Sequence, residues 1–530
     1  MSSSSVRLRT GSGTPAGDRP AAALAAARLW RRVGLAGAVV TAIAATGVGD
    51  LPATDELGNW PTFLWSGQRT WPAVLLAYLG LTLLAGSWWQ LRAVTRRMAD
   101  RLSFVLRTGV LWAIPLALAP PLQSRDVYSY LAQGALYAGG LDPYRVGPSA
   151  LGGPLADNVS AIWQDTPAPY GPLFLGVASG VTSASGHHVV LAVLLMRVVM
   201  IGALVATTAC MVPLARRFGV DPSTAVWLGI LNPLTLIHVV SGAHNDALMV
   251  MLMIVGLWLG VRHRPVLAAM VLGLAVLVKL PAAVGMVVVV PAMARALHGR
   301  FRMVRGALAV GVVSLLTMIA VTLLMGTWYG WVSALSDTAR IRNGLSVTTN
   351  VGMLVNALAW LVGAGTGAMD AVSVVRGLGV ATAGVLTLVV LVRRRGKPVY
   401  ALALIMFAVV LLGPVVHPWY LLWGIVPLAV STRDPRVVQR VALLTVVLAL
   451  YPMPWGEGFS GVIVWGVLGS AVAAFALVVA MRAQATVLAG PPAVADAVGR
   501  RAADPGTVPV TGPAVGPVAD PAAGLGAAAR

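Results

Sequence analysis

The sequence predicts an all-α protein that crosses a lipid bilayer many times. Hydrophobic residues make up 58% of the chain and charged residues only 11%, a composition typical of polytopic membrane proteins. Lys and Arg occur in short clusters between the apolar runs, which is the charge pattern of cytoplasmic loops. The net charge of +20 therefore requires no nucleic acid partner. The single cysteine, Cys210, lies within an apolar run, so no disulfide framework is expected.

The apolar runs, oriented by the basic clusters, predict about fourteen crossings, within a range of about 12–15 transmembrane helices. The predicted spans are 33–49, 71–90, 104–121, 189–214, 223–240, 247–261, a pair within 265–296 broken at Pro281, 306–326, 372–392, 400–416, 419–431, 437–452 and 461–481. Residues 351–365 are too few for a span, and a crossing there would place the basic cluster 393–397 outside. We therefore expect a re-entrant or interfacial segment at 351–365.

The spans divide the chain into three regions. We expect a disordered cytoplasmic arm at 1–30, a transmembrane domain at 31–482 and a disordered cytoplasmic tail at 483–530. The arm has no apolar core, so no cleavable signal peptide is expected. Two long loops, 122–188 and 327–350, are predicted on the extracytoplasmic side.

The stretch 120–130 opens the longest polar interval of the chain. Ser124 can cap a helix in which Asp126, Ser129 and Gln133 share one face and apolar residues share another. We expect an amphipathic helix at the membrane interface with one carboxylate at its start. Asp126 either favours the helix N-terminus electrostatically or takes part in chemistry.

A second polar motif, His244-Asn245-Asp246, lies at the turn between two apolar runs. It is either a polar helix–helix turn capped by Asp246, or it brings His244 and Asp246 to the hydroxyls of a sugar. Two potential metal ligands at this spacing are weak evidence for a metal site.

Five cations lie at or near membrane depth on the predicted outer side: Arg197, Lys279, Arg340, Arg342 and Arg376. Lys279 precedes Pro281, which breaks a helix, and it either extends to the interface or binds an anion such as a lipid phosphate. Arg340 and Arg342 are either an ordinary basic pair or further phosphate ligands. Arg197 lies inside the span 189–214, where a charge is costly.

An aromatic cluster, His417-Pro418-Trp419-Tyr420-Leu421-Leu422-Trp423, lies at a predicted membrane exit. Trp and Tyr gather at membrane interfaces. Aromatic walls also stack on sugar rings and accommodate apolar chains. Both alternatives are open at this point.

Six short motifs in this order carry a family resemblance: Arg125-Asp126-Val127-Tyr128-Ser129-Tyr130, Asp142-Pro143-Tyr144, Tyr170-Gly171-Pro172, His244-Asn245-Asp246-Ala247-Leu248-Met249, Lys279-Leu280-Pro281 and His417-Pro418-Trp419-Tyr420. From about residue 30 to 480 the chain resembles the actinobacterial polyprenol-phosphate-mannose-dependent mannosyltransferases of the GT-C superfamily. Within them it looks most like the α-1,6-mannosyltransferases that build the mannan backbone of lipomannan and lipoarabinomannan.

The resemblance implies a GT-C-type bundle with extracytoplasmic amphipathic helices, placed in the plasma membrane with its active site on the extracytoplasmic side. Region 31–482 is then the catalytic domain and 122–188 its main catalytic loop. The implied reaction moves mannose, with inversion, from polyprenyl-phosphate mannose to the 6-hydroxyl of a lipid-anchored mannoside acceptor. It requires no cofactor and leaves the use of a divalent metal open.

The resemblance also implies roles for individual residues. Asp126 matches the acidic catalytic base of GT-C enzymes, although its loop follows the third predicted span instead of the first. The expected donor-phosphate ligands are Lys279, Arg340, Arg342 and Arg197. The expected substrate-binding residues are Arg125, Tyr128, Tyr170, His244, Asn245, Asp246, His417, Trp419 and Tyr420. The alternatives are transfer to another linkage, such as α-1,2, transfer of another lipid-linked sugar, and transport of a lipid-linked sugar across the membrane.

Overall fold

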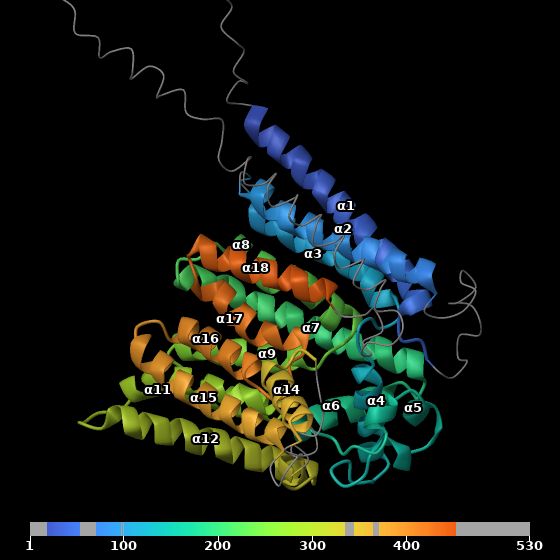
Figure 1. Cartoon of the computed structure of the whole chain (residues 1–530). Coiled ribbons are helices and arrows are strands. Elements are labelled where there is room, and N and C mark those ends of the chain that lie inside the picture. Colours follow the sequence, from blue (N-terminus) through green and yellow to red (C-terminus); the bar gives the residue numbers. More distant parts are fainter. Residues whose placement is uncertain are drawn as a thin grey trace, which may run out of the picture. The chain divides into compact units, whose positions relative to one another are not determined.

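The computed structural model describes residues 18–52, 70–96, 98, 100–333, 344–363 and 370–451. Every regular element in these residues is a helix, which confirms the predicted all-α class. Six of the described helices are long and apolar enough to cross a bilayer (Figure 1): α1 (Asp18–Val48), α2 (Trp71–Thr95), α3 (Arg101–Leu118), α7 (Val189–Arg217), α12 (Arg302–Met325) and α15 (Ala371–Arg393).

The other described helices are shorter. They are α4 (Asp126–Ala138), η2 (Pro148–Ala150), α5 (Gly153–Asp157), η3 (Ala161–Trp163), α6 (Pro172–Ala184), α8 (Pro222–Gly229), η4 (Thr235–Ser241), α9 (Asp246–Val261), α10 (Pro265–Val276), η5 (Leu280–Ala283), α11 (Val284–Arg295), α14 (Val347–Leu361), α16 (Pro398–Leu411), η6 (Pro418–Leu421), α17 (Leu422–Ser431) and α18 (Pro435–Leu450). Together, η4 and α9 are apolar enough to form a seventh crossing, but the chain bends by 109° between them.

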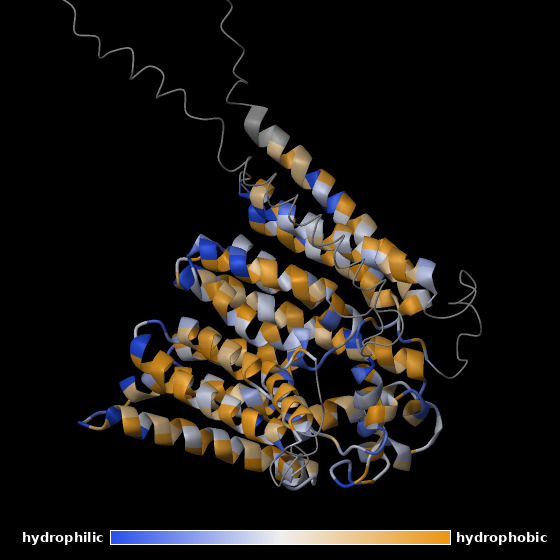
Figure 2. Ribbon diagram, in the orientation of Figure 1, coloured by the Kyte–Doolittle hydropathy of each residue, from blue (hydrophilic) through white to orange (hydrophobic). Residues whose placement is uncertain are grey.

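The apolar surface of the long helices is the surface expected of a membrane protein. Figure 2 shows hydrophobic residues along the length of the helices and hydrophilic residues gathered near their ends. On α12 and α15 few side chains are buried, and apolar residues such as Leu324 and Leu388 are largely exposed. Without a bilayer such exposure would be unfavourable, so these faces are suited to contact with lipid.

The predicted loop 122–188 forms a small group of helices at one end of the long ones. Here α4 packs against α5, α6 and α7, and Figure 1 shows α4, α5 and α6 together. The expectation of an amphipathic α4 with an exposed polar face is wrong. Ser129 and Gln133 are buried like the apolar residues around them, because α4 is covered on both faces.

Four other expectations can be compared with the helices. The segment 18–30, expected to be disordered, belongs to α1. The predicted span 223–240 is interrupted, because α8 ends at Gly229 and the π-helix η4 begins at Thr235. The predicted break at Pro281 is confirmed by η5 between α10 and α11. The segment 351–365 lies largely in α14, which is shorter than the helices that qualify as spans.

Several expectations lie outside the described residues. These are the start of the predicted arm, the span 461–481, the tail 483–530 and the part of the loop 327–350 at 334–343. The domain boundaries drawn from the sequence therefore stay predictions.

Candidate active site

At the start of α4, the Asp126 carboxylate meets a tyrosine and a histidine. The backbone N–H of Asp126 donates to Ser124 Oγ at 3.1 Å. The predicted cap at Ser124 is nevertheless wrong, because the N-cap residue of α4 is Arg125, which makes no side-chain capping hydrogen bond. Tyr130, one turn later on the same face, donates to Asp126 Oδ2 at 3.5 Å. His244 Nδ1 lies 3.6 Å from that oxygen and 3.3 Å from the Tyr130 hydroxyl. One carboxylate oxygen therefore faces two groups that can hydrogen-bond to it.

The surroundings of Asp126 raise the pKa of its carboxyl toward neutral pH. Burial raises the pKa of Asp126 to about 6, against the opposing effects of the Lys279 charge and the hydrogen bonds from Ser124 and Tyr130. Burial also raises the pKa of the Tyr130 hydroxyl well above its ordinary value, so Tyr130 keeps its proton. The Asp126 side chain is 24% exposed. Asp126 can therefore accept a proton from a group that approaches its open side.

His244 is placed by an unusual backbone. The π-helix η4 ends at Ser241, and Ala243 has φ 53°, in the left-handed region. The chain then turns into α9, whose first residue is Asp246. π-Helical segments and non-glycine residues at positive φ are enriched at functional sites. The motif 244–246 lies at this turn between two helices, as predicted, and it is completely buried.

Asp246 forms a buried ion pair with Lys279. The Lys279 ammonium lies 3.0 Å from each carboxylate oxygen of Asp246, and the Trp423 indole donates to Asp246 Oδ1 at 2.6 Å. Removal of one partner from such a pair leaves a buried, uncompensated charge. Lys279 is therefore anchored in the site, and part of its charge is balanced by Asp246.

Aromatic rings surround the Lys279 ammonium. Its nitrogen lies 4.4 Å from the ring centroid of Tyr420 and 6.0 Å from that of Tyr170, within the range of cation–π attraction. The loop that carries Tyr170 reaches this place through Gly171, where any Cβ would overlap with the carbonyl oxygen of Leu277. Glycine is therefore required for the loop to lie so close to the end of α10.

The segment 417–423 contributes a stacked wall. The Trp419 ring stacks on two histidines. Its centroid lies 4.3 Å from that of His417 and 3.8 Å from that of His244. Tyr420 stacks on Trp423 at 4.4 Å. Trp419 and Trp423 are buried. These two rings therefore pack against the site, and they do not form an exposed interfacial belt.

Several buried polar atoms here have no hydrogen-bond partner among the described residues. They are both ring nitrogens of His238, Nε2 of His244, the amide oxygen and nitrogen of Asn245, and the indole nitrogen of Trp419. Unpaired buried polar groups are rare in folded proteins and call for water or a ligand. The site therefore retains hydrogen-bonding capacity for a polar substrate.

Arg125 and Tyr128, expected to bind substrate, make their contacts elsewhere. Arg125 donates to the carbonyl oxygen of Asn158 at 3.2 Å, and its guanidinium carbon lies 5.7 Å from the Tyr128 ring centroid. The Tyr128 hydroxyl donates to the carbonyl oxygen of Asp50 at 2.6 Å. Tyr128 lies two residues after Asp126 on α4 and so points away from the face that carries the carboxylate.

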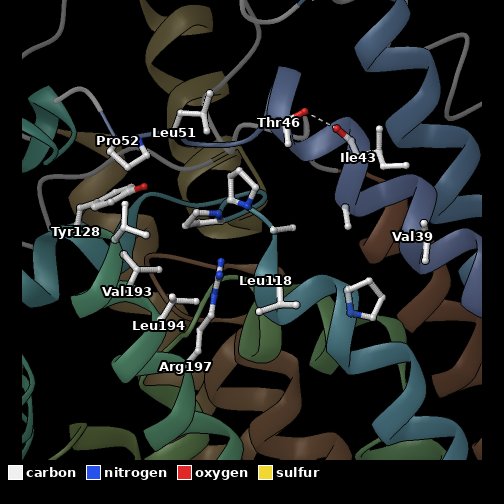
Figure 3. Close-up of a pocket in the computed structure, with 16 residues that line it drawn as sticks. Val39, Ile43, Thr46, Leu51, Pro52, Leu118, Tyr128, Val193, Leu194 and Arg197 are labelled. Atoms are coloured by element: carbon white, nitrogen blue, oxygen red, sulfur yellow. Dashed lines mark hydrogen bonds between the residues drawn. The ribbon is translucent and has the colours of Figure 1, made fainter. Parts of the chain in front are cut away.

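Tyr128 lines a separate apolar pocket of about 470 Å³ beside the start of α4. Its walls come from α1, α3 and α7, with residues such as Val39, Leu118 and Val193 (Figure 3). Val39 and Leu118 are exposed, with 40% and 72% of their surface accessible. The opening of this pocket therefore lies on the exposed surface of apolar helices.

The expected phosphate ligand Arg197 lies in this apolar pocket (Figure 3). Its Nε and Nη2 donate to the carbonyl oxygen of Ser241 at 2.9 and 2.6 Å, and Nη1 donates to that of Ala117 at 2.8 Å. Its guanidinium has no carboxylate within ion-pair distance in the described part of the chain. Arg340 and Arg342 lie outside the described residues.

The sequence predicts no individual role for Tyr130, His238 or Trp423, although Tyr130 lies in the motif 125–130 and Trp423 in the aromatic cluster 417–423. Tyr130 follows Asp126 by one helical turn, and Trp423 follows Trp419 by the same spacing, so helical periodicity gave a usable signal for both. His238 could not be found in this way, because its position depends on the π-helix.

The fold and the site together define a multi-span membrane protein with a partly open carboxylate beside a buried ion pair and an aromatic wall. In the described part of the chain, no group of three His, Cys, Asp or Glu side chains is arranged to hold a metal ion. The chemistry these side chains can supply is proton transfer at Asp126, positive charge at Lys279 and hydrogen bonds to a polar substrate.

Two family models match the chain. One, described as the N-terminal domain of alpha-(1->6)-mannopyranosyltransferase, covers residues 31–295, and the other, the MptB C-terminal domain, covers residues 348–482. The chain therefore belongs to the alpha-(1->6)-mannopyranosyltransferase family, as the six motifs suggested.

Individual relatives agree with this assignment. The chain is 33% identical to a probable alpha-(1->6)-mannopyranosyltransferase of Mycolicibacterium smegmatis, over 85% of this chain and 88% of the relative. It is 34% identical to alpha-(1->6)-mannopyranosyltransferase A of Mycobacterium tuberculosis, over 82% and 86%. It is 32% identical to alpha-(1->6)-mannopyranosyltransferase B of Corynebacterium glutamicum, over 76% and 72%. These identities do not separate type A from type B. No solved structure matches the chain.

Proposed function

We propose that this protein is an inverting mannosyltransferase that moves mannose from polyprenyl-phosphate mannose to the 6-hydroxyl of a lipid-anchored mannoside acceptor. The observation that carries the proposal is the Asp126 carboxylate, partly open, with a pKa of about 6 and held beside Tyr130 and His244. It occurs in a chain of the alpha-(1->6)-mannopyranosyltransferase family. The product is the α-1,6-linked mannan backbone of lipomannan or lipoarabinomannan.

The reaction proceeds by one displacement. The acceptor oxygen forms a bond to the anomeric carbon while the bond from that carbon to the phosphate oxygen breaks, and the leaving polyprenyl phosphate keeps the electron pair. The proton of the acceptor hydroxyl passes to Asp126 as the new bond forms. An inverting transfer of this kind needs one base and no covalent nucleophile.

Tyr130 and His244 support this role of Asp126. Both face Oδ2, so Oδ1 is the oxygen left to accept the proton. Tyr130 keeps its own proton because burial raises its pKa well above the ordinary value. The two residues therefore orient the carboxylate and do not compete for the substrate proton.

Lys279 is the cation in place to balance the charge that develops on the leaving phosphate. The Lys279 charge also acts on Asp126: among the effects that lower the pKa of that carboxyl, it is the largest. The Lys279 ammonium donates to both carboxylate oxygens of Asp246 and also hydrogen-bonds with the Tyr420 side chain. A donor phosphate would therefore bind Lys279 beside these two residues. Arg340 and Arg342 stay predicted contributors to the same task.

The sugar is held by the polar and aromatic groups around the ion pair. Asn245 and His244 offer unpaired hydrogen-bonding atoms, and Tyr170, His417 and Tyr420 offer ring faces that suit a pyranose. We assign the lipid chain of the donor to the apolar pocket beside α4, where Arg197 adds a positive charge. This arrangement corresponds to a GT-C enzyme of the plasma membrane with its site on the extracytoplasmic side.

The test uses purified full-length protein, radiolabelled polyprenyl-phosphate mannose and a short α-1,6-linked mannoside. We expect an α-1,6-linked product from the wild-type protein and a loss of turnover of at least about a thousandfold in Asp126→Asn. Asp157→Asn is the matched control, because Asp157 is an exposed carboxylate of the same loop. Near-normal turnover of Asp126→Asn would remove the base assignment. An α-1,2 product, or donor movement across liposomes without transfer, would overturn the proposed reaction.

A further inference from the structure

A basic pocket of about 460 Å³ lies among the ends of several helices, away from the candidate active site. It is lined by the end of α2, the start of α3, the α7–α8 connection and the α17–α18 connection. The 18 residues of α3 separate this pocket from the stretch that leads to Asp126, a distance of about 27 Å along a helix. The pocket is therefore distinct from the mannosyl-transfer site.

Four arginines line the pocket, and they come from three separate parts of the chain. Arg92 and Arg96 belong to the end of α2, Arg101 begins α3, and Arg433 precedes α18. The one acidic residue in the lining is Asp221, so the lining carries a charge of 4 − 1 = +3. Such a concentration of like charge is unfavourable unless an anion binds there.

Asp221 can neutralise only a small part of this charge. Its carboxylate already accepts hydrogen bonds from Ser223 and Thr224, where it caps α8. Its distance to the Arg101 guanidinium is 3.7 Å, and both side chains are about two-fifths exposed. An exposed pair at this distance contributes little. The charges of Arg92 and Arg96 have no carboxylate partner among the described residues.

Two of the lining arginines, Arg92 and Arg433, are held by residues packed behind the pocket. Trp88 and Trp227 stack at 4.3 Å, and the indole N–H of each donates to the backbone carbonyl oxygen of the other. Arg92 lies over the Trp227 ring at 5.3 Å, and its buried Nε has no hydrogen-bond partner in the described part of the chain. The Arg433 guanidinium lies against Gly219, where any Cβ would overlap with it. Gly219 also has φ 65°, in the left-handed region.

The pocket also lies where a lipid headgroup would be. It is formed at the end of α2 and the start of α3, both of which are long and apolar enough to cross a bilayer. It therefore lies at a membrane–water boundary, on the side that the basic clusters predict to be cytoplasmic. Basic pockets between membrane helices on that side recognise the headgroups of anionic lipids.

We infer that this pocket binds the phosphate headgroup of an anionic phospholipid in the predicted cytoplasmic leaflet. The guanidinium groups of Arg96 and Arg101 supply hydrogen bonds to the phosphate oxygens. Arg92 and Arg433, held by Trp227 and by the end of α7, supply positive charge behind them. The inference does not depend on the proposed transfer reaction, because the two sites share no residue.

Native mass spectrometry of the full-length protein in detergent, titrated with phosphatidylglycerol or phosphatidylcholine, tests the inference. We expect one retained phosphatidylglycerol per protein and no retained phosphatidylcholine. In Arg96→Gln with Arg101→Gln, the phosphatidylglycerol concentration at half-saturation should rise by about tenfold or more at low ionic strength. The matched control is Arg393→Gln with Arg395→Gln, which removes two exposed arginines from another basic cluster.

Three outcomes would overturn the inference: equal weakening in the two double variants, equal retention of phosphatidylcholine, or displacement of the lipid by inorganic phosphate at equimolar concentration. The last outcome would mark a site for a free anion. Mannosyl transfer by the Arg96→Gln with Arg101→Gln variant serves as a folding control and should remain close to wild type. If that variant does not fold, Arg96→Glu alone, at an exposed position, should weaken phosphatidylglycerol retention.

Discussion

Replacement of Tyr130 by Phe should move the pH dependence of mannosyl transfer to higher pH. Asp126 acts as a base only when it is ionised. With a pKa of about 6, it is roughly 90% ionised at pH 7 and roughly 9% at pH 5. Wild-type kcat/KM should therefore fall about tenfold between these two values.

The size of the shift follows from the hydrogen bond that is lost. The Tyr130 hydroxyl donates to Asp126 Oδ2, and this bond lowers the pKa of the carboxyl. A hydrogen bond to a charged group contributes about 1.5–3 kcal/mol at ordinary length. This bond is 3.5 Å long, so we take a contribution of about 1 kcal/mol, and 1.36 kcal/mol corresponds to one pKa unit. The acidic limb of Tyr130→Phe should thus lie about 0.7 units higher, with rates about threefold below wild type at pH 6 and nearly equal at pH 8.

The assay is kcat/KM from pH 5 to pH 9 with radiolabelled donor and a mannoside acceptor. Tyr329→Phe is the control, because Tyr329 is a partly exposed tyrosine outside the site. A uniform loss of rate at every pH would mean that Tyr130 has only a structural role. An acidic limb that stays in place would refute the view that Tyr130 stabilises the ionised form of Asp126.

The other predictions concern the ion pair, the Tyr170 loop and the apolar pocket. Lys279→Met should lower the free energy of unfolding by on the order of 3–5 kcal/mol, because Asp246 is left buried without its partner. The double variant with Asp246→Leu should recover thermal stability but not transfer, and recovery of both would refute a role of the pair in the reaction. Gly171→Ala should lower the free energy of unfolding by on the order of 1–3 kcal/mol, measured by a thermal melt, since the added methyl group overlaps with a backbone carbonyl. Gly180→Ala is the control and should leave stability unchanged, because nothing lies near its Cβ. Leu194→Trp should fill the apolar pocket and raise KM for a long-chain donor more than for a short-chain one, and equal effects would mean that the pocket does not hold the donor chain.

The sequence singled out candidate site residues because polar residues are rare in an apolar chain. Asp126, Lys279 and the motif 244–246 stood out for this reason, and the structure brings all of them into one cluster. Their partners were harder to predict. The bond from Trp423 to Asp246 joins residues 177 positions apart, and the pair of Lys279 with Asp246 joins residues 33 positions apart. No local pattern encodes such distances.

The burial of α4 could not be predicted for a different reason. The alternation of polar and apolar residues along 126–138 fits a helix at an interface as well as a helix between two packed layers. Ser129 and Gln133 are buried, so the polar face of α4 lies against protein and not against water. The sequence also predicted a continuous span at 223–240, because hydropathy does not reveal the break between α8 and the π-helix η4.

This break matters for how the chain places polar groups inside a hydrophobic bundle. A continuous helix satisfies its own backbone and would leave His244 about 120° around the helix from His238. The π-helix and the left-handed Ala243 instead bring both histidine rings to the Trp419 ring, with the buried Asn245 next in the chain. Their polar atoms then lie buried without partners in the described part of the chain, at a cost of about 1–3 kcal/mol for each unsatisfied group. A sugar carries several hydroxyls and is the kind of ligand that would satisfy these groups together. The unpaired groups that cost stability would then orient the bound sugar.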